Sequence, residues 1–180
     1  MPRTFLAIDL PEATRQALRH LWPPAGTGVR PVKEGQLHLT LHFLGDVPAG
    51  EVPRLTSAVA DIVFSPFTLS ISGVGRFPPK GRASVLWAGV SACPALRELH
   101  ASLGQALTAA GYAIERRPYT PHVTLARLTP QAPRDLAERF LADHAKLRLP
   151  DITVSSFVVY ESRRGDRGSE HVPLLRVAAT

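Results

Sequence analysis

The chain has 180 residues, of which 44% are hydrophobic and 20% are charged. This composition is that of an ordinary globular protein, and it excludes a disordered chain and a membrane-spanning helix because no apolar run approaches the required length. The net charge of +6 is carried mostly by arginine, which fits a polyanionic partner and equally fits a biased composition.

The elements expected along the chain alternate between strands and helices. The first half predicts a strand at 4–10, a helix at 11–21, a loop at 23–36, a strand at 37–44, a helix near 50–63, and strands near 67–75 and 84–91 joined by the basic loop RFPPKGR. The second half predicts a helix at 94–110, a strand at 122–128, a helix at 134–147, and strands near 152–160 and 171–178 joined by the basic loop SRRGDRGS.

Two short motifs, HLTL at 38–41 and HVTL at 122–125, stand within predicted strands. Because side chains alternate along a strand, His38 and Thr40 point the same way about 7 Å apart, and so do His122 and Thr124. Chance predicts about 0.01 copies of such a motif in a chain of this composition. The pair of motifs therefore indicates two titratable groups and two hydroxyl donors that serve one cleft.

The order of elements is the same in both halves: helix, motif strand, helix, strand, basic loop, strand. This repeat predicts an α+β fold in which two antiparallel sheets, related by a pseudo-twofold and covered by outer helices, surround a central cleft. We expect one bilobal domain over residues 1–180, with the first motif in a lobe around 37–91 and the second in a lobe around 94–178.

The chain is similar to the two-histidine (2H) phosphoesterases, specifically the bacterial and archaeal RNA 2′,3′-cyclic phosphodiesterases historically called 2′-5′ RNA ligases. The resemblance covers nearly the whole chain and is carried by FLAIDLP, LHLTLHFLGDV, RxxxLWAGV at 82–90, PHVTLARL at 121–128 and VYES at 159–162. One departure is His171, near a position where relatives often carry tyrosine.

The resemblance implies hydrolysis of RNA 2′,3′-cyclic phosphate to a 2′-phosphate end, with 2′-5′ ligation as the reverse activity and with no cofactor. It also implies that His38 is the proton donor, that His122 is the proton acceptor, and that Thr40 and Thr124 hold the phosphate. This chemistry suits the residues, because a histidine pKa near 6.5 lets one neutral and one protonated imidazole coexist near neutrality.

Two residues next to the motifs are further substrate-binding candidates. His42 has the parity of His38, but on a strand the two imidazoles lie about 13 Å apart, too far to share a metal ion. A role for His42 in the cleft wall or in packing is therefore favoured. Arg127 has the opposite parity to Thr124, so it reaches the phosphate only through a bulge; a surface ion pair is the alternative.

Loop residues supply the remaining candidates for substrate binding. Arg76 and Arg163, together with Arg82, Arg164 and Arg167, could rim the cleft and contact RNA phosphates. Phe77 and Tyr119 are candidates for base stacking, with core packing as the alternative for at least one of them.

The remaining expectations concern partners and location. The single cysteine, Cys93, excludes an intrachain disulfide and a multi-thiolate metal site, so we expect no metal. The opening segment reaches Asp9 after four apolar residues, too few for a signal-peptide core, so we expect a cytoplasmic monomer that binds RNA and no membrane. Two alternatives stay open: a non-catalytic RNA-binding module, which paired imidazoles argue against, and a phosphodiesterase for ADP-ribose 1″,2″-cyclic phosphate or 2′-5′ oligonucleotides.

Overall fold

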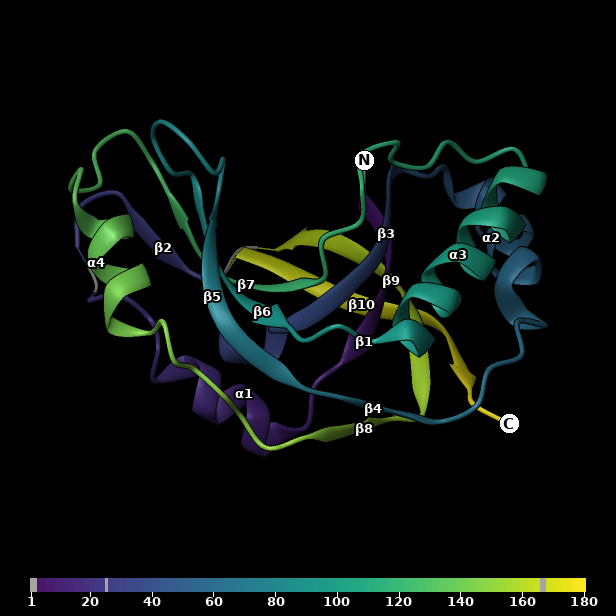
Figure 1. Ribbon diagram of the computed structural model, residues 1–180. Coiled ribbons are helices and arrows are strands. Elements are labelled where there is room, and N and C mark those ends of the chain that lie inside the picture. Colours follow the sequence, from purple (N-terminus) through teal and green to yellow (C-terminus); the bar gives the residue numbers. More distant parts are fainter. Residues whose placement is uncertain (1–2, 25, 166–167) are drawn as a thin grey trace.

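A computed structural model of the chain describes residues 3–24, 26–165 and 168–180 (Figure 1). The strands are β1 (Arg3–Asp9), β2 (Val29–Pro31), β3 (His38–Asp46), β4 (Phe67–Leu69), β5 (Ile71–Phe77), β6 (Val85–Val90), β7 (His122–Leu128), β8 (Ile152–Val154), β9 (Ser156–Gly165) and β10 (Gly168–Ala178). The helices are α1 (Glu12–Arg19), α2 (Val52–Ala60), α3 (Pro94–Ala109) and α4 (Leu136–Asp143), with 3₁₀ turns η1 (Glu34–Gln36) and η2 (Ala49–Glu51).

Two antiparallel half-sheets form the body of the molecule. One contains β10, β9, β1 and β3 in that order, and the other contains β7, β6 and β5 with β2 also paired to β7. The halves join edge to edge at a single register pair, Leu39 with Val123, between β3 and β7. This joint is central because it brings the two HxT motifs together. The predicted α+β class and its two antiparallel sheets are confirmed.

The lobes differ from the consecutive halves expected from the sequence. The strands that follow the first motif, β5 and β6, pair with each other and with β7 of the second motif. Strands β9 and β10 follow the second motif, but β9 pairs with β1 of the first lobe, and β10 pairs with β9. Each half-sheet therefore combines strands from both of the expected ranges, 37–91 and 94–178.

Helices cover each end of the molecule. Helices α2 and α3 contact one another, with α3 on β3 and α2 on β10, whereas α4 contacts β5. Figure 1 shows α2 and α3 at one end and α1 and α4 at the other. Within the described residues, no helix is both long and apolar enough to cross a bilayer.

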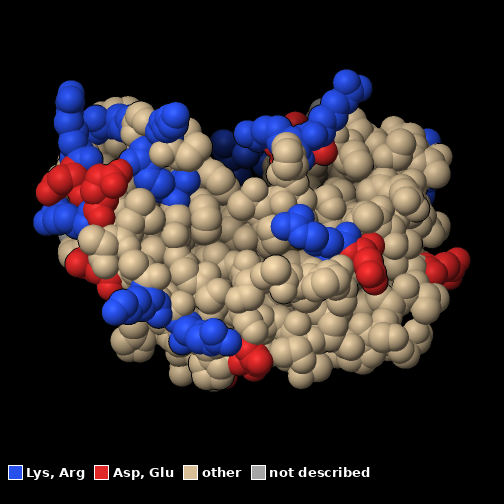
Figure 2. Space-filling model, viewed as in Figure 1, with Lys and Arg blue, Asp and Glu red and all other residues tan. Residues whose placement is uncertain are grey.

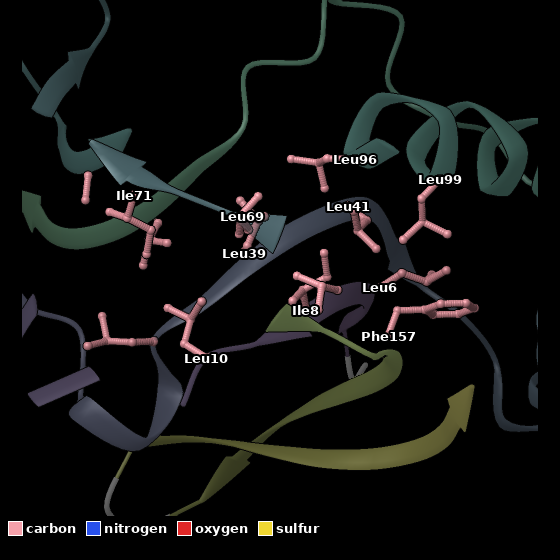
Figure 3. Close-up of a cluster of buried hydrophobic side chains, with 14 of the residues drawn as sticks. Leu6, Ile8, Leu10, Leu39, Leu41, Leu69, Ile71, Leu96, Leu99 and Phe157 are labelled. Atoms are coloured by element: carbon pink, nitrogen blue, oxygen red, sulfur yellow. The ribbon is translucent and has the colours of Figure 1, made fainter. Parts of the chain in front are cut away.

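The core continues beneath both lobes as one cluster of buried aliphatic side chains. Figure 3 shows Leu39 and Leu41 of β3 between the β1 side chains and Leu96 and Leu99 of α3. Leu39 is fully buried, as is Val123 opposite it. Burial of each such side chain stabilises the fold by about 1.5–3 kcal/mol. The motif strands are thus fixed from beneath, and their polar side chains face the other way.

Two stretches that were expected to be loops contain strands. Strand β2 falls within the stretch expected to be a loop, where it adds a short edge to β7. The expected basic loop SRRGDRGS is mostly hairpin, because Arg163 pairs with Glu170 and Arg164 with Ser169 in the β9–β10 ladder. Polar residues can form such a ribbon because it projects into solvent and needs no apolar alternation. Arg167 lies outside the described residues.

Candidate active site

The same bulge interrupts both motif strands. In β3, Thr40 pairs with Ala7 and His42 with the preceding residue of β1, so Leu41 is an extra residue. In β7, Thr124 pairs with Trp87 and Ala126 with the preceding residue of β6, so Leu125 is extra. A bulge shifts the alternation of side chains by one position. After each motif, the second residue past the bulge therefore turns toward the cleft.

The two catalytic candidates are oriented in the same way by their own backbone. His38 Nδ1 lies 2.7 Å from the carbonyl oxygen of Gln36, and His122 Nδ1 lies 2.7 Å from that of Thr120. Because a carbonyl only accepts, each Nδ1 carries the hydrogen and each Nε2 is left for chemistry. His38 Nε2 lies 3.1 Å from Thr40 Oγ1. Each motif thus presents an imidazole of fixed tautomer beside a threonine.

Aromatic walls hold each imidazole in position. His38 stacks on Phe5 of β1 with ring centroids 4.9 Å apart, and His171 of β10 approaches His38 edge-on at 5.3 Å. His122 meets Phe77 edge-on at 4.9 Å. Trp87 packs against His122 at 5.9 Å, over Gly75 of β5, where any larger side chain would overlap the indole. The rings are confined on both sides of the joint between β3 and β7.

Burial lowers the pKa of both imidazoles. The pKa of His38 falls to about 4, mainly because burial disfavours its charged form, and the nearby His171 and His122 lower it further. The hydrogen bond to Gln36 and the carboxylate of Asp9 oppose this shift without cancelling it. Burial also lowers the pKa of His122, as does the positive charge of Arg127. Both rings are therefore neutral at pH 7 in the ligand-free protein.

A cavity of about 1200 Å³ opens beside this pair. Its lining consists of Arg3, Phe5, Val32, Gln36, His38, Thr40, Phe43, Asp46, Thr124, Arg127, Glu161, Ser162, Arg163, Arg164, Ser169 and His171. Figure 2 shows a hollow between the two ends of the molecule with Lys and Arg side chains on both of its sides. His122 is not among these lining residues; its ring packs against Phe77 and Trp87, and it lowers the pKa of His38 electrostatically. The cavity is thus suited to an anion that reaches both motifs.

Several predicted site residues come together here. His38, Thr40 and Thr124 line the cavity, and His122 is two residues before Thr124 on β7. Arg127 also lines the cavity, because the bulge at Leu125 reverses the parity that its sequence position suggested. The predicted rim residue Arg163 lines the cavity as well, paired with the carboxylate of Glu161.

Besides Phe77, which packs against Trp87 and His122, three predicted substrate-binding residues lie outside the cavity lining. His42 is buried and donates from Nε2 to the carbonyl oxygen of His100, 2.8 Å away, because the bulge at Leu41 turns it into the core. Tyr119 stacks on His100 at 3.8 Å and donates to the carbonyl oxygen of Thr40. Arg76 is tied to Glu138 and to backbone oxygens of its own loop. All three serve the structure, and base stacking remains a prediction only for Phe77.

Several residues that line the cavity were not predicted from the sequence. Phe5, Phe43 and Arg3 line the cavity although none of them was a predicted site residue. The alternation along β1 could have identified Phe5, because Asp9 pairs with His38 in the β1–β3 register. His171, noted only as a departure from relatives, lies against the ring of His38. Among the described residues, no group of three or more His, Cys, Asp or Glu is arranged to hold a metal ion.

Comparisons of sequence connect this arrangement to known proteins. A family model described as the 2′-5′ RNA ligase superfamily matches residues 10–166. A relative from Escherichia coli named RNA 2′,3′-cyclic phosphodiesterase is 32% identical over 185 residues, covering 99% of this chain and 97% of its own length. A relative of that name from Thermus thermophilus is 37% identical over 142 residues, covering 73% and 71%. One from Geobacillus stearothermophilus is longer, and the 34% identical match of 128 residues covers 68% of this chain but 41% of that protein.

Solved structures agree over the full length. The crystal structure of TT0787 of Thermus thermophilus has a TM-score of 0.79 at 28% identity, covering 98% of this chain and 97% of that one. The crystal structure of E. coli LigT complexed with 3′-AMP has a TM-score of 0.77 at 30% identity, covering 100% and 99%. With two HxT motifs joined at one cavity and a family model matched over most of its length, the chain belongs to the 2′-5′ RNA ligase superfamily.

Proposed function

We propose that this protein hydrolyses RNA 2′,3′-cyclic phosphate ends to 2′-phosphate ends without a metal, using His38 and His122 as its acid and base. One observation carries the proposal. The two HxT motifs meet at the Leu39–Val123 pair, and in each the Nδ1 of the histidine is held by a backbone carbonyl so that Nε2 is available. The E. coli and Thermus relatives named RNA 2′,3′-cyclic phosphodiesterase support the same reaction.

The reaction needs proton transfers on opposite sides of phosphorus. Nε2 of His122 removes a proton from water as the water oxygen attacks phosphorus, and the bond from phosphorus to the 3′ oxygen breaks. Nε2–H of His38 protonates that departing oxygen, which leaves a 2′-phosphate and a 3′-hydroxyl. An in-line displacement requires the two imidazoles to flank the phosphate, and the antiparallel joint between β3 and β7 is suited to this geometry.

The phosphate oxygens need donors that strengthen as negative charge develops. The hydroxyls of Thr40 and Thr124 line the cavity and can donate to the non-bridging oxygens. The guanidinium of Arg127 lines the same cavity and can bind the anion in a bidentate manner. These three groups act on the phosphate, whereas the histidines act on the oxygens that enter and leave.

The bound phosphate also adjusts the protonation of the pair. Burial lowers the pKa of both imidazoles in the free protein. A bound anion places negative charge beside both rings and raises both pKa values. One ring can then hold the proton required of the acid while the other stays neutral as the base. Substrate binding therefore favours the reactive combination of protonation states.

The direct test incubates the protein with a nucleoside 2′,3′-cyclic phosphate in EDTA and identifies the product against 2′- and 3′-monophosphate standards. We expect the 2′-phosphate, and no turnover by a His38→Ala/His122→Ala variant prepared in the same way. Turnover that requires a divalent ion would end the metal-free account. Binding of the nucleotide without turnover would indicate an RNA-binding module, and faster turnover of ADP-ribose 1″,2″-cyclic phosphate would change the substrate.

A further inference from the structure

The cavity extends away from the catalytic pair along one lobe only. Strands β9 and β10 contribute Glu161, Ser162, Arg163, Arg164, Ser169 and His171 to its lining, whereas β5 and β6 contribute none of the described lining residues. Its volume of about 1200 Å³ exceeds the roughly 300–1000 Å³ of typical small-ligand pockets. A terminal nucleotide bound at the two motifs would leave space on the β9–β10 side.

Arg3 lines this extension and lies two residues along β1 from Phe5, the residue that stacks on His38. Phe5 stacks on His38, and Arg3 is the next residue on the same face of β1, about 7 Å further along the strand. In the neighbouring ladder Arg3 pairs with Ser162 of β9, so it lies beside the strand that carries Arg163 and Arg164. The extension therefore has cations from two adjacent strands.

The arginines of this wall differ from those of the opposite lobe in what they already contact. Within the described residues, the side chains of Arg3 and Arg164 have no ion pair or hydrogen bond, although Asp46 is the register partner of Arg3 in β3. On the opposite lobe, Arg76 binds Glu138, and Arg82 binds the carbonyl oxygens of Pro130 and Ala132. Apart from Arg127 beside the second motif, the uncommitted guanidinium groups in the described cavity lining belong to β1 and β9.

The chemistry of the proposed substrate indicates which part of it would contact the guanidinium groups of β1 and β9. A nucleotide that ends in a 2′,3′-cyclic phosphate is joined to the rest of the RNA through its 5′ oxygen, so the nearest other anion is the phosphate on its 5′ side. We propose that Arg3 and Arg164 form a subsite for this phosphate, and that the RNA strand leaves the active site over β1, β9 and β10. This inference rests on the proposed function.

The test compares two substrates that differ by that phosphate and the nucleoside attached to it. One is a nucleoside 2′,3′-cyclic phosphate, and the other is a dinucleotide that ends in the same cyclic group. In an Arg3→Ala/Arg164→Ala variant, kcat/KM for the dinucleotide should fall about ten-fold or more, as expected when a charged hydrogen bond is removed, while that for the nucleoside stays within about two-fold. The dependence of dinucleotide KM on salt should also weaken, by about 0.7 in log–log slope for each phosphate that the variant no longer binds.

Arg134→Ala/Arg148→Ala is the matched control, because both arginines are exposed and outside the cavity lining, and their removal also subtracts two positive charges. An equal fall for both substrates, or no fall for the dinucleotide, would overturn the subsite. A fall in the control as large as in the Arg3→Ala/Arg164→Ala variant would overturn it as well, since net charge would then explain the effect. If the unchanged protein turns over neither substrate, the proposed function fails and the subsite with it.

Discussion

At the scale of single residues, the site consists of two imidazoles that differ in their surroundings more than in their backbone setting. His38 has its Nε2 beside Thr40 Oγ1, whereas His122 Nε2 has no hydrogen-bond partner among the described residues. A free lone pair suits the base, whereas His38 can act as the acid only when a bound anion offsets the burial that lowers its pKa, a shift that the carboxylate of Asp9 opposes only in part. The pseudo-twofold therefore relates positions that are alike in geometry and unlike in electrostatics.

Substitution of the quartet tests these roles. His38→Ala and His122→Ala should each lower kcat by about 10²–10⁴-fold, since general acid–base catalysis contributes this much. The fall in kcat of the double variant should be far smaller than the product of the two single falls. Thr40→Ala or Thr124→Ala should cost about ten-fold, which corresponds to one phosphate hydrogen bond. Steady-state rates measure the effect, and unchanged melting temperatures control for folding. Threonine variants slower than the histidine variants would contradict the assignment.

Much of this quartet could be predicted from the sequence, because the H-x-T spacing places both side chains on one face of a strand. The hydrogen bond from each Nδ1 to the carbonyl two residues earlier could not, since it depends on the backbone path through Gln36 and Thr120. His171 was also beyond prediction, because its contact with His38 joins residues that are far apart in the chain.

At the scale of elements, the bulges decide which neighbours of the motifs face substrate. Without them, His42 and Ala126 would continue the cleft face, and Phe43 and Arg127 would turn away. With them, Phe43 and Arg127 line the cavity, while His42 enters the core beside His100. One extra residue in each strand thus puts Phe43 in place of His42 on the cavity wall after the first motif, and puts Arg127 on that wall after the second.

His42→Ala distinguishes this arrangement from a cleft position. The substitution removes a ring stacked at 4.1 Å on His100 and a hydrogen bond to its carbonyl, so the free energy of unfolding should fall by about 1–3 kcal/mol. Turnover at a temperature where the variant is folded should change by less than about ten-fold. Phe43→Ala is the control with the opposite pattern, a raised KM with little loss of stability, because Phe43 is 48% exposed. A loss of turnover from His42→Ala equal to that from His38→Ala would indicate that His42 acts in the cleft and not in the core.

Prediction at this scale failed where alternation was extended past a bulge. The run HLTLHF gives no sign of an extra residue, since leucine at position 41 is apolar in either register. The bulge is visible only in the pairing with β1, where Ala7 is opposite Thr40 and Leu6 is opposite His42. For Arg127 the sequence analysis considered a bulge. It could not decide whether the side chain faces the phosphate site or forms an ion pair on the surface.

At the scale of the whole molecule, five histidines share one response to acid. Burial lowers the pKa of His38, His42, His100, His122 and His171, with neighbouring positive charges adding to the shift in some of them. The unfolded chain, where histidine has its ordinary pKa near 6.5, therefore binds more protons than the folded chain below that pH. The contribution of these neutral histidines to the free energy of unfolding is therefore fully present above pH 6.5. It is lost as the pH falls toward the pKa values of the folded protein.

Thermal unfolding between pH 7 and pH 5 measures this loss. Each proton that the unfolded chain binds in excess lowers the free energy of unfolding by about 1.4 kcal/mol per pH unit, so the melting temperature should fall steadily below pH 6.5. His38→Gln removes one of the titrating groups and should make the fall shallower. A melting temperature that stays constant down to pH 5 would show that these histidines remain accessible to protons in the folded state.

The exchange of strands between lobes has a consequence for how the gene can be divided. A fragment that ends between β6 and α3 would contain the β1–β3 pair and the β5–β6 pair, but β7, which connects them, would be on the other fragment. That second fragment would hold β7 and the β9–β10 ribbon, which are not paired to each other. Each half of the coding sequence therefore specifies separate pieces of sheet with open edges, and only the two polypeptides together complete a sheet. The repeat visible in the order of elements therefore does not correspond to a self-contained unit of the sheet.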